Sequence, residues 1–255
     1  MPPQTTTPRD RLIVALDVPN TNRALELVSK VAESAGVFKI GKQLFVAGGP
    51  QLVREVTSRG SRIFLDLKFH DIPNTVAGAV TSAAALGVSM LTVHASGGLK
   101  MLKAAVEAAS QSPNPPLILA VTVLTSMNDE DMQQVGVSGR VLDQVLRLAT
   151  LAREAGCGGI VASPHEVREI RRELGGGFAI VTPGVRPAGT DAGDQARVLT
   201  PAQAIAAGAT HLVVGRPITQ APDPAQAAQA IVEEIAGAEI TSRGYPPSPT
   251  GEKST

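Results

Sequence analysis

The chain repeats one pattern eight times, and this repetition constrains the fold more than any other feature of the sequence. In each repeat a short apolar run ends in a polar residue or a turn, and an Ala- and Leu-rich helical stretch follows. The runs span residues 11–17, 37–41, 62–68, 90–95, 117–124, 159–163, 178–184 and 211–218. Runs that are apolar on both faces are typical of a parallel sheet covered by helices. Eight such units within about 225 residues predict a closed (β/α)₈ TIM barrel, a fold of about 250 residues.

An open, doubly wound sheet is the structural alternative. That fold would carry a glycine-rich nucleotide loop after its first strand, whereas residues 16–22 read LDVPNTN. No stretch between the predicted strands has the composition of a linker, so we predict one domain over residues 11–236. The Pro/Thr-rich residues 1–10 and the Pro/Ser/Thr/Gly-rich residues 237–255 are expected to be mobile tails.

Charge and composition exclude several classes of function. Lys and Arg number 23, as do Asp and Glu, so the formal net charge is zero and no basic field exists to hold nucleic acid. The absence of Trp and the presence of a single Tyr argue against a base-stacking platform. No run of 18 apolar residues is present, so we expect no membrane span. One cysteine, Cys157, excludes an intrachain disulfide and a multi-cysteine metal site, and favours a reduced, cytoplasmic location.

Polar side chains gather where the predicted strands end. In a barrel these carboxyl ends share one rim, and chemistry takes place there. Any single polar residue at a strand end has a ready structural explanation, because the chain must leave the core. The concentration of charge is the informative part. The strand ends carry Asp17, Lys39, Asp66, Lys68, His94, Thr125, Ser163, Arg186 and Arg216.

The densest segment is FLDLKFHDIPNT, residues 64–75. Asp66 and Lys68 are two apart on a predicted strand, so both side chains are expected on the same face. Asp71 follows after a turn, and Lys39 ends the neighbouring strand. A structural ion-pair network is one interpretation of these four charges. The functional interpretation is an alternating array that holds a proton donor beside fixed negative charge, since coupled charges of this kind often mark active sites.

Two glycine–arginine turns follow the seventh and eighth strands. TPGVRPAG, residues 182–189, contains Gly184 and Arg186, and VVGRPIT, residues 213–219, contains Gly215 and Arg216. Glycine and proline are ordinary turn residues, so each motif alone is weak. Together, at the two strands whose loops bind phosphate in many barrels, they predict a phosphate site.

The remaining polar candidates are less specific. Thr125 and Ser126, just after strand five, offer hydroxyls to a polar ring. His94 is either a structural rim residue or a site residue, and His70 is more readily explained as structural. The sequence shows no cluster with metal-ligand spacing, no phosphate-binding P-loop and no nucleophile elbow.

Several motifs, taken in order, resemble a known family. VALD, FKIGKQLF, LDLKFHDIPNT, VTVLTS, TPGVRP, AGDQ and VVGRPIT, within residues 11–236, are similar to orotidine 5′-phosphate decarboxylases of the bacterial type. The resemblance implies a (β/α)₈ barrel, usually a homodimer, that converts orotidine 5′-monophosphate (OMP) to uridine 5′-monophosphate (UMP) and CO₂ in pyrimidine synthesis. It also implies that neither a metal nor an organic cofactor takes part.

The same resemblance implies a role for each matching residue. Lys68 would donate the proton, flanked by Asp66 and by Asp71, which would reach into the partner's site. Lys39 and Asp17 would hold the ribose hydroxyls and complete the charge array. The remaining roles are contacts across the interface by Ile72 and Thr75, contacts to the pyrimidine by Thr125 and Ser126, and contacts to the phosphate by Arg186, Gln195, Gly215 and Arg216.

Two alternatives remain at this point. Sugar-phosphate lyases of the same superfamily share the D-x-K-x-x-D strand but need Mg²⁺ and carry an acidic residue where this chain has Lys39. An ammonium at that position would repel the cation, so Lys39 favours the decarboxylase. The second alternative is a phosphate-ligand sensor without catalysis, which predicts a decayed Lys/Asp array, whereas the array here is intact.

Overall fold

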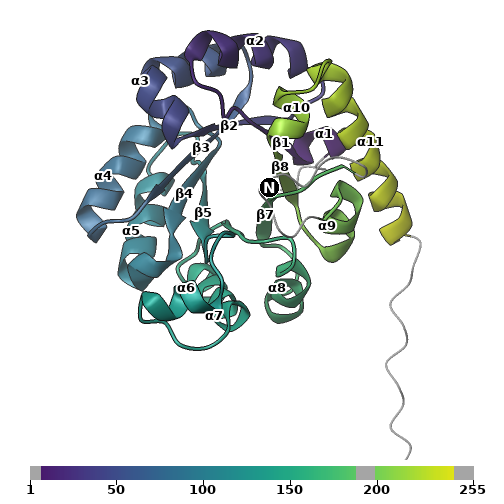
Figure 1. The fold of residues 1–255 in the computed structure, drawn as a ribbon. Helices are drawn as coiled ribbons and strands as arrows, with labels where there is room; N and C mark the ends of the chain where they lie inside the picture. Colours follow the sequence, from purple (N-terminus) through teal and green to yellow (C-terminus); the bar gives the residue numbers. More distant parts are fainter. Residues whose placement is uncertain (1–6, 188–198, 244–255) are drawn as a thin grey trace, which may run out of the picture.

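The computed structural model describes residues 7–187 and 199–243, and within them eight parallel strands close into a barrel (Figure 1). Each strand pairs with its neighbours in sequence, and β1 closes the barrel by pairing with β8. The strands are β1 Leu12–Ala15, β2 Val37–Gly41, β3 Arg62–Phe69, β4 Met90–His94, β5 Leu117–Val121, β6 Gly159–Val161, β7 Ala179–Pro183 and β8 His211–Val214. The predicted TIM barrel is confirmed, and each strand falls on one of the eight predicted runs.

Helices form a ring around the barrel, as Figure 1 shows. Most of them connect one strand to the next, the arrangement that right-handed strand–helix–strand units produce. The helices are α1 Pro8–Arg11, α2 Thr21–Val31, α3 Lys42–Ser58, α4 Pro73–Ala84, α5 Gly98–Ser110, α6 Asp129–Gln134, α7 Val141–Glu154, α8 Val167–Leu174, α9 Pro201–Ala207, α10 Arg216–Thr219 and α11 Pro224–Arg243, with a 3₁₀ turn, η1, at Ala95–Gly97.

Three boundaries differ from the sequence prediction. The N-terminal segment expected as a tail includes α1, which begins at Pro8 after a capping box at Thr7. The C-terminal segment expected as a tail includes the end of α11, which continues to Arg243. The eighth apolar run was expected to extend to residue 218, but β8 ends at Val214 and α10 begins at Arg216. Gly215 therefore lies in the turn between the strand and the helix, and Arg216 is the first residue of the helix.

Side chains that alternate along the strands fill the inside of the barrel. Ile13, Val37, Phe64 and Met90 belong to one buried cluster there, and a second, larger cluster fills the space between strands and helices. Because successive side chains point to opposite faces, the residue two positions after each interior residue also points inward. On β2 and β3 these positions are Lys39 and Asp66, so the alternation that builds the core also places charge at its upper end.

Two further features concern membrane insertion and the reactivity of the single cysteine. In the described part of the chain, no helix is long and apolar enough to cross a membrane. Cys157 is buried, and burial raises the pKa of its thiol to about 12. The thiol is therefore protonated and unreactive at neutral pH.

Candidate active site

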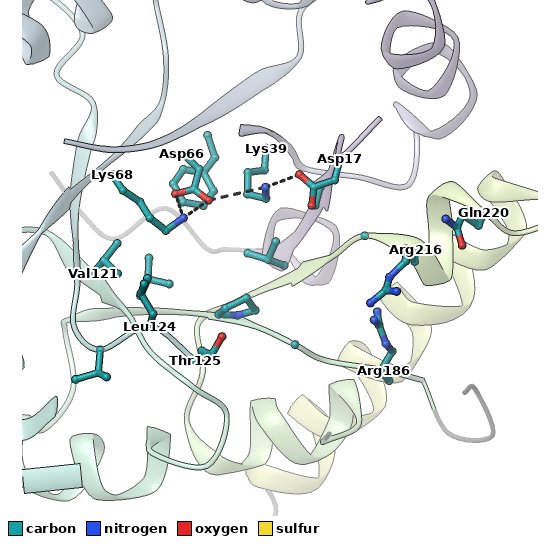
Figure 2. A pocket seen from close by; sticks show the side chains of 18 residues that line it. Asp17, Lys39, Asp66, Lys68, Val121, Leu124, Thr125, Arg186, Arg216 and Gln220 are labelled. Carbon is teal, nitrogen blue, oxygen red and sulfur yellow. Dashed lines mark hydrogen bonds and ion pairs between the residues drawn. The ribbon is translucent and has the colours of Figure 1, made fainter. Parts of the chain in front are cut away.

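Four charged side chains form a continuous network at the carboxyl ends of β1, β2 and β3 (Figure 2). The Lys68 Nζ atom lies 2.7 Å from Asp66 Oδ1 and 2.8 Å from Asp66 Oδ2. The Lys39 Nζ atom lies 3.8 Å from Asp66 Oδ2 and donates a hydrogen bond of 2.9 Å to Asp17 Oδ1. The charges alternate in sign along the series Lys68, Asp66, Lys39 and Asp17, so neighbouring groups attract throughout.

Burial makes this network sensitive to the loss of any member. Lys39 and Asp66 are each only 9% exposed, and both would be costly to bury unpaired. The Lys68 side chain is 24% exposed. Lys68 is thus the cation of the network that faces open space while remaining held by a buried carboxylate.

The backbone of β3 reaches this arrangement through an irregularity that the sequence does not predict. Leu65 pairs with Leu91 and Phe69 with Val93, so three residues of β3 lie opposite one residue of β4. Lys68 is the only non-glycine residue of the described chain with a positive φ, at 54°. Asp66 and Lys68 do contact each other, as predicted, but the strand that carries them is not regular. A bulge and a left-handed residue, not the pleat, bring their side chains together.

Thr92 on β4 holds the bulge, and the sequence analysis missed this residue. Its hydroxyl accepts a hydrogen bond of 2.9 Å from the Lys68 backbone N–H and donates one of 3.0 Å to Asp66 Oδ1. Thr92 is fully buried. The available signal was its position two residues after the interior residue Met90, where a hydroxyl inside an apolar barrel needs polar partners.

A cavity of about 480 Å³ opens beside the network. Figure 2 shows Lys68, Asp66, Lys39 and Asp17 along one side, with Arg186 and Arg216 close together at the far end. The cavity thus has a lysine ammonium paired with a carboxylate at one end and two arginine guanidinium groups at the other. The other described residues that line it are Ala15, Phe64, Val121, Val123, Leu124, Thr125, Val161, Pro183, Gly184, Val213, Gly215 and Gln220. Gln220, which directly follows α10, was not anticipated from the sequence.

Comparison with known proteins identifies relatives that match most of the chain. The model of the orotidine 5′-phosphate decarboxylase / HUMPS family matches residues 10–231. An orotidine 5′-phosphate decarboxylase of Moorella thermoacetica is 56% identical over 233 residues, covering 89% of this chain and 92% of that protein. One of Alkalilimnicola ehrlichii is 52% identical over 231 residues, covering 91% and 98%. The crystal structure of the Lactobacillus acidophilus orotidine 5′-phosphate decarboxylase has a TM-score of 0.80 at 38% identity, covering 88% and 98%.

The chain belongs to this family. The resemblance drawn from the sequence motifs is confirmed by comparisons that cover most of the barrel. The distantly related orotidine 5′-phosphate decarboxylase of Pyrococcus horikoshii keeps the same architecture, with a TM-score of 0.72 at 27% identity.

Some of the predicted site residues of this decarboxylase-family chain do not line the cavity, including the three that were expected to act across a dimer interface. Asp71, Ile72 and Thr75 are exposed on the β3–α4 segment, and the fourth member of the charge network is Asp17 rather than Asp71. Ser126 lines a neighbouring cavity of about 830 Å³, which shares Thr125 with the first. Gln195 lies outside the described residues.

The neighbouring cavity also holds a carboxyl group with an unusual pKa. Glu166 lies at the start of α8 and accepts a hydrogen bond of 2.9 Å from the Ser163 backbone N–H. Burial raises the pKa of Glu166 from 4.5 to about 7. The folded state therefore favours the protonated carboxyl, and its stability falls as the pH rises from about 4.5 to about 7.

Glu166→Gln is expected to stabilise this protein at alkaline pH. The amide keeps an oxygen to accept the Ser163 N–H but carries no charge to desolvate. The penalty removed is on the order of 3 kcal/mol once Glu166 is fully ionised. Urea unfolding followed by circular dichroism should show a higher free energy of unfolding for the variant at pH 9 and a much smaller difference at pH 5. Glu173→Gln, an exposed site on the same helix, should change neither value; an equal gain at both pH values would contradict this account.

Proposed function

We propose that this protein decarboxylates OMP to UMP and CO₂ in pyrimidine biosynthesis, in the cytoplasm. Its family and its curated relatives at 52–56% identity support a carboxy-lyase of this kind. The observation that carries the proposal is the Lys68–Asp66–Lys39–Asp17 network at one side of a cavity whose far end holds two arginines.

The two ends of the cavity suit the two ends of a nucleoside monophosphate. Arg186 and Arg216, which both line the cavity, would fork onto phosphate oxygens, and Gly215 would let the backbone approach the same group. Asp17 and Lys39 would hold the ribose hydroxyls between the phosphate and the reacting ring. Thr125 and Ser126 would contact the pyrimidine. Gln195 would add a contact at the phosphate, as the family resemblance implies.

Lys68 is the group that this chemistry requires. When the bond between C6 and the carboxylate breaks, CO₂ leaves and the electron pair stays on C6 in the plane of the ring. The π-system cannot delocalise that pair, so the protein must stabilise it by electrostatics. The Lys68 ammonium would face the developing carbanion and then transfer its proton to C6. Asp66, hydrogen-bonded to Lys68 through both oxygens, would keep the ammonium charged and aimed.

The site is proposed to be completed by a second copy of the chain. Asp71, Ile72 and Thr75 would cross a homodimer interface into the partner's site. Their exposure in a single chain supports this placement, and Ile72 is an apolar side chain that is 66% exposed. A large apolar side chain at that exposure is typical of an interaction surface.

Decarboxylation of OMP should survive exhaustive treatment with EDTA. Lys39 places an ammonium where the related sugar-phosphate lyases need a metal ligand, and the described residues contain no group of three His, Cys, Asp or Glu side chains arranged to hold a metal. The measurement is the loss of OMP absorbance by the chelator-treated protein, with untreated protein as the control. Activity that disappears with EDTA and returns with Mg²⁺ would support the lyase alternative instead.

A further inference from the structure

Two histidine rings contact each other beside the charge network. The ring centroids of His70 and His94 lie 5.5 Å apart, with 40° between the ring planes. His94 is the last residue of β4, and His70 follows the last residue of β3. These two strands are neighbours in the barrel wall (Figure 1). The described residues that line the 480 Å³ cavity do not include either ring.

The His70 ring also lies close to the 3₁₀ turn η1, which follows β4. A Cβ atom added to Gly97 in η1 would lie 3.3 Å from His70 Cδ2, so η1 passes close to the ring, although the room that this glycine leaves is filled by the Met101 side chain. His70 is therefore held between the β4 end and the turn that follows it. The next residue in the chain is Asp71, whose Oδ1 accepts a hydrogen bond of 2.6 Å from the Ile72 backbone N–H. The exposed β3–α4 loop is thus attached to β4 at the residue immediately before Asp71.

The two rings pack against each other in a tilted arrangement. Burial, and the nearby His70, Lys42 and Lys68, lower the pKa of His94, while Asp66 opposes them. These effects favour the neutral form of the His94 ring. A neutral ring at this position can support another ring by dispersion and shape, and a phenyl ring can replace it in that role.

We propose that His94 is a positioning residue that acts through His70 to hold the Asp71 loop for the partner's active site. The inference rests on the proposed function, in which Asp71 acts in the partner subunit. Loss of the His94 ring leaves the chain's own network of Lys68, Asp66 and Lys39 intact but displaces its Asp71. The defect therefore falls on the partner's site.

His94→Ala is expected to lower kcat by about 10²-fold, the loss that a displacement of about 1 Å at a reacting centre can produce. His94→Phe should retain activity within a few-fold of wild type because it keeps the ring contact. His70→Ala, at an exposed position, should reproduce the loss even where His94→Ala folds poorly. Ser96→Ala, an exposed change in the same turn, is the control and should leave kcat and KM unchanged.

Subunit mixing separates this role from a general structural one. A mixed dimer of His94→Ala and Lys68→Ala chains contains one site with intact Lys68 and a correctly held Asp71 from the other chain. Random exchange should therefore restore roughly a quarter of wild-type activity. A merely structural defect stays with its own chain, and mixing would restore nothing. Mixed dimers are verified by native mass spectrometry.

The outcomes are distinguishable from failure of the proposed function. A mixture of Asp71→Ala and Lys68→Ala tests the position of Asp71 alone. If that mixture recovers activity and the His94→Ala mixture does not, the positioning role is overturned while the shared site stands. Wild-type activity in folded His94→Ala, or equal losses in His94→Phe and His94→Ala, would overturn it as well.

Discussion

Lys68→Ala is expected to lower the turnover of OMP by more than the roughly 10²–10⁴-fold that loss of a general acid alone produces. The excess arises because, in the proposed mechanism, Lys68 would be both the proton donor and the cation nearest the developing carbanion. UMP binding should weaken far less, because the arginine end of the cavity is untouched. Steady-state kinetics with OMP and calorimetric titration with UMP give the two quantities.

Arg216→Ala provides the contrasting variant. Removal of a guanidinium at the phosphate end should mainly raise KM, with a smaller fall in kcat if phosphate binding supports closure over the ring. Circular dichroism establishes that both variants are folded. Equal and small effects from the two substitutions would count against the proposed roles of Lys68 and Arg216.

Mixing two inactive variants should recover activity if Asp71 acts across the dimer. Lys68→Ala and Asp71→Ala homodimers are each expected to be nearly inactive. In a mixed dimer one site carries both defects and the other carries neither, so random exchange should leave roughly a quarter of all sites intact. The measurement is the decarboxylation rate before and after subunit exchange.

The control for this experiment is the composition of the mixture. Native mass spectrometry shows whether mixed dimers have formed. Confirmed exchange without recovered activity would place Asp71 in its own chain's site, because each site of a mixed dimer would then still carry one defect. That result would remove the shared site and leave the decarboxylase proposal in place.

The barrel could be predicted from the sequence because its signal is local and repeated. Each strand is a short apolar run that can be recognised without knowing its partners, and all eight observed strands lie on the predicted runs. The convergence of Lys39, Asp66 and Lys68 also followed, since carboxyl ends of parallel strands share one rim. The predicted ends of the elements were less accurate where polar and apolar residues mix, as at α1 and α10.

The fine structure of the site could not be predicted because it depends on pairing between distant segments. The bulge in β3 exists only relative to β4, and Thr92 lies 24 residues after Lys68. Gln220 enters the cavity through a turn whose direction the sequence does not encode locally. The raised pKa of Glu166 likewise arises from burial by the surrounding fold rather than from neighbouring charges.

The left-handed backbone at Lys68 sets backbone strain against the proposed catalytic role at one position. A side chain at φ 54° costs on the order of 1 kcal/mol relative to glycine, which adopts this conformation freely. Glycine at position 68 would relieve the strain and also remove an ammonium from the mouth of the barrel. Selection of this chain for heat resistance alone would therefore weigh that strain against the ion pair with buried Asp66, whereas selection for the proposed decarboxylation would keep the lysine. Screens for robust variants should hold position 68 fixed and look for gains at sites such as Glu166.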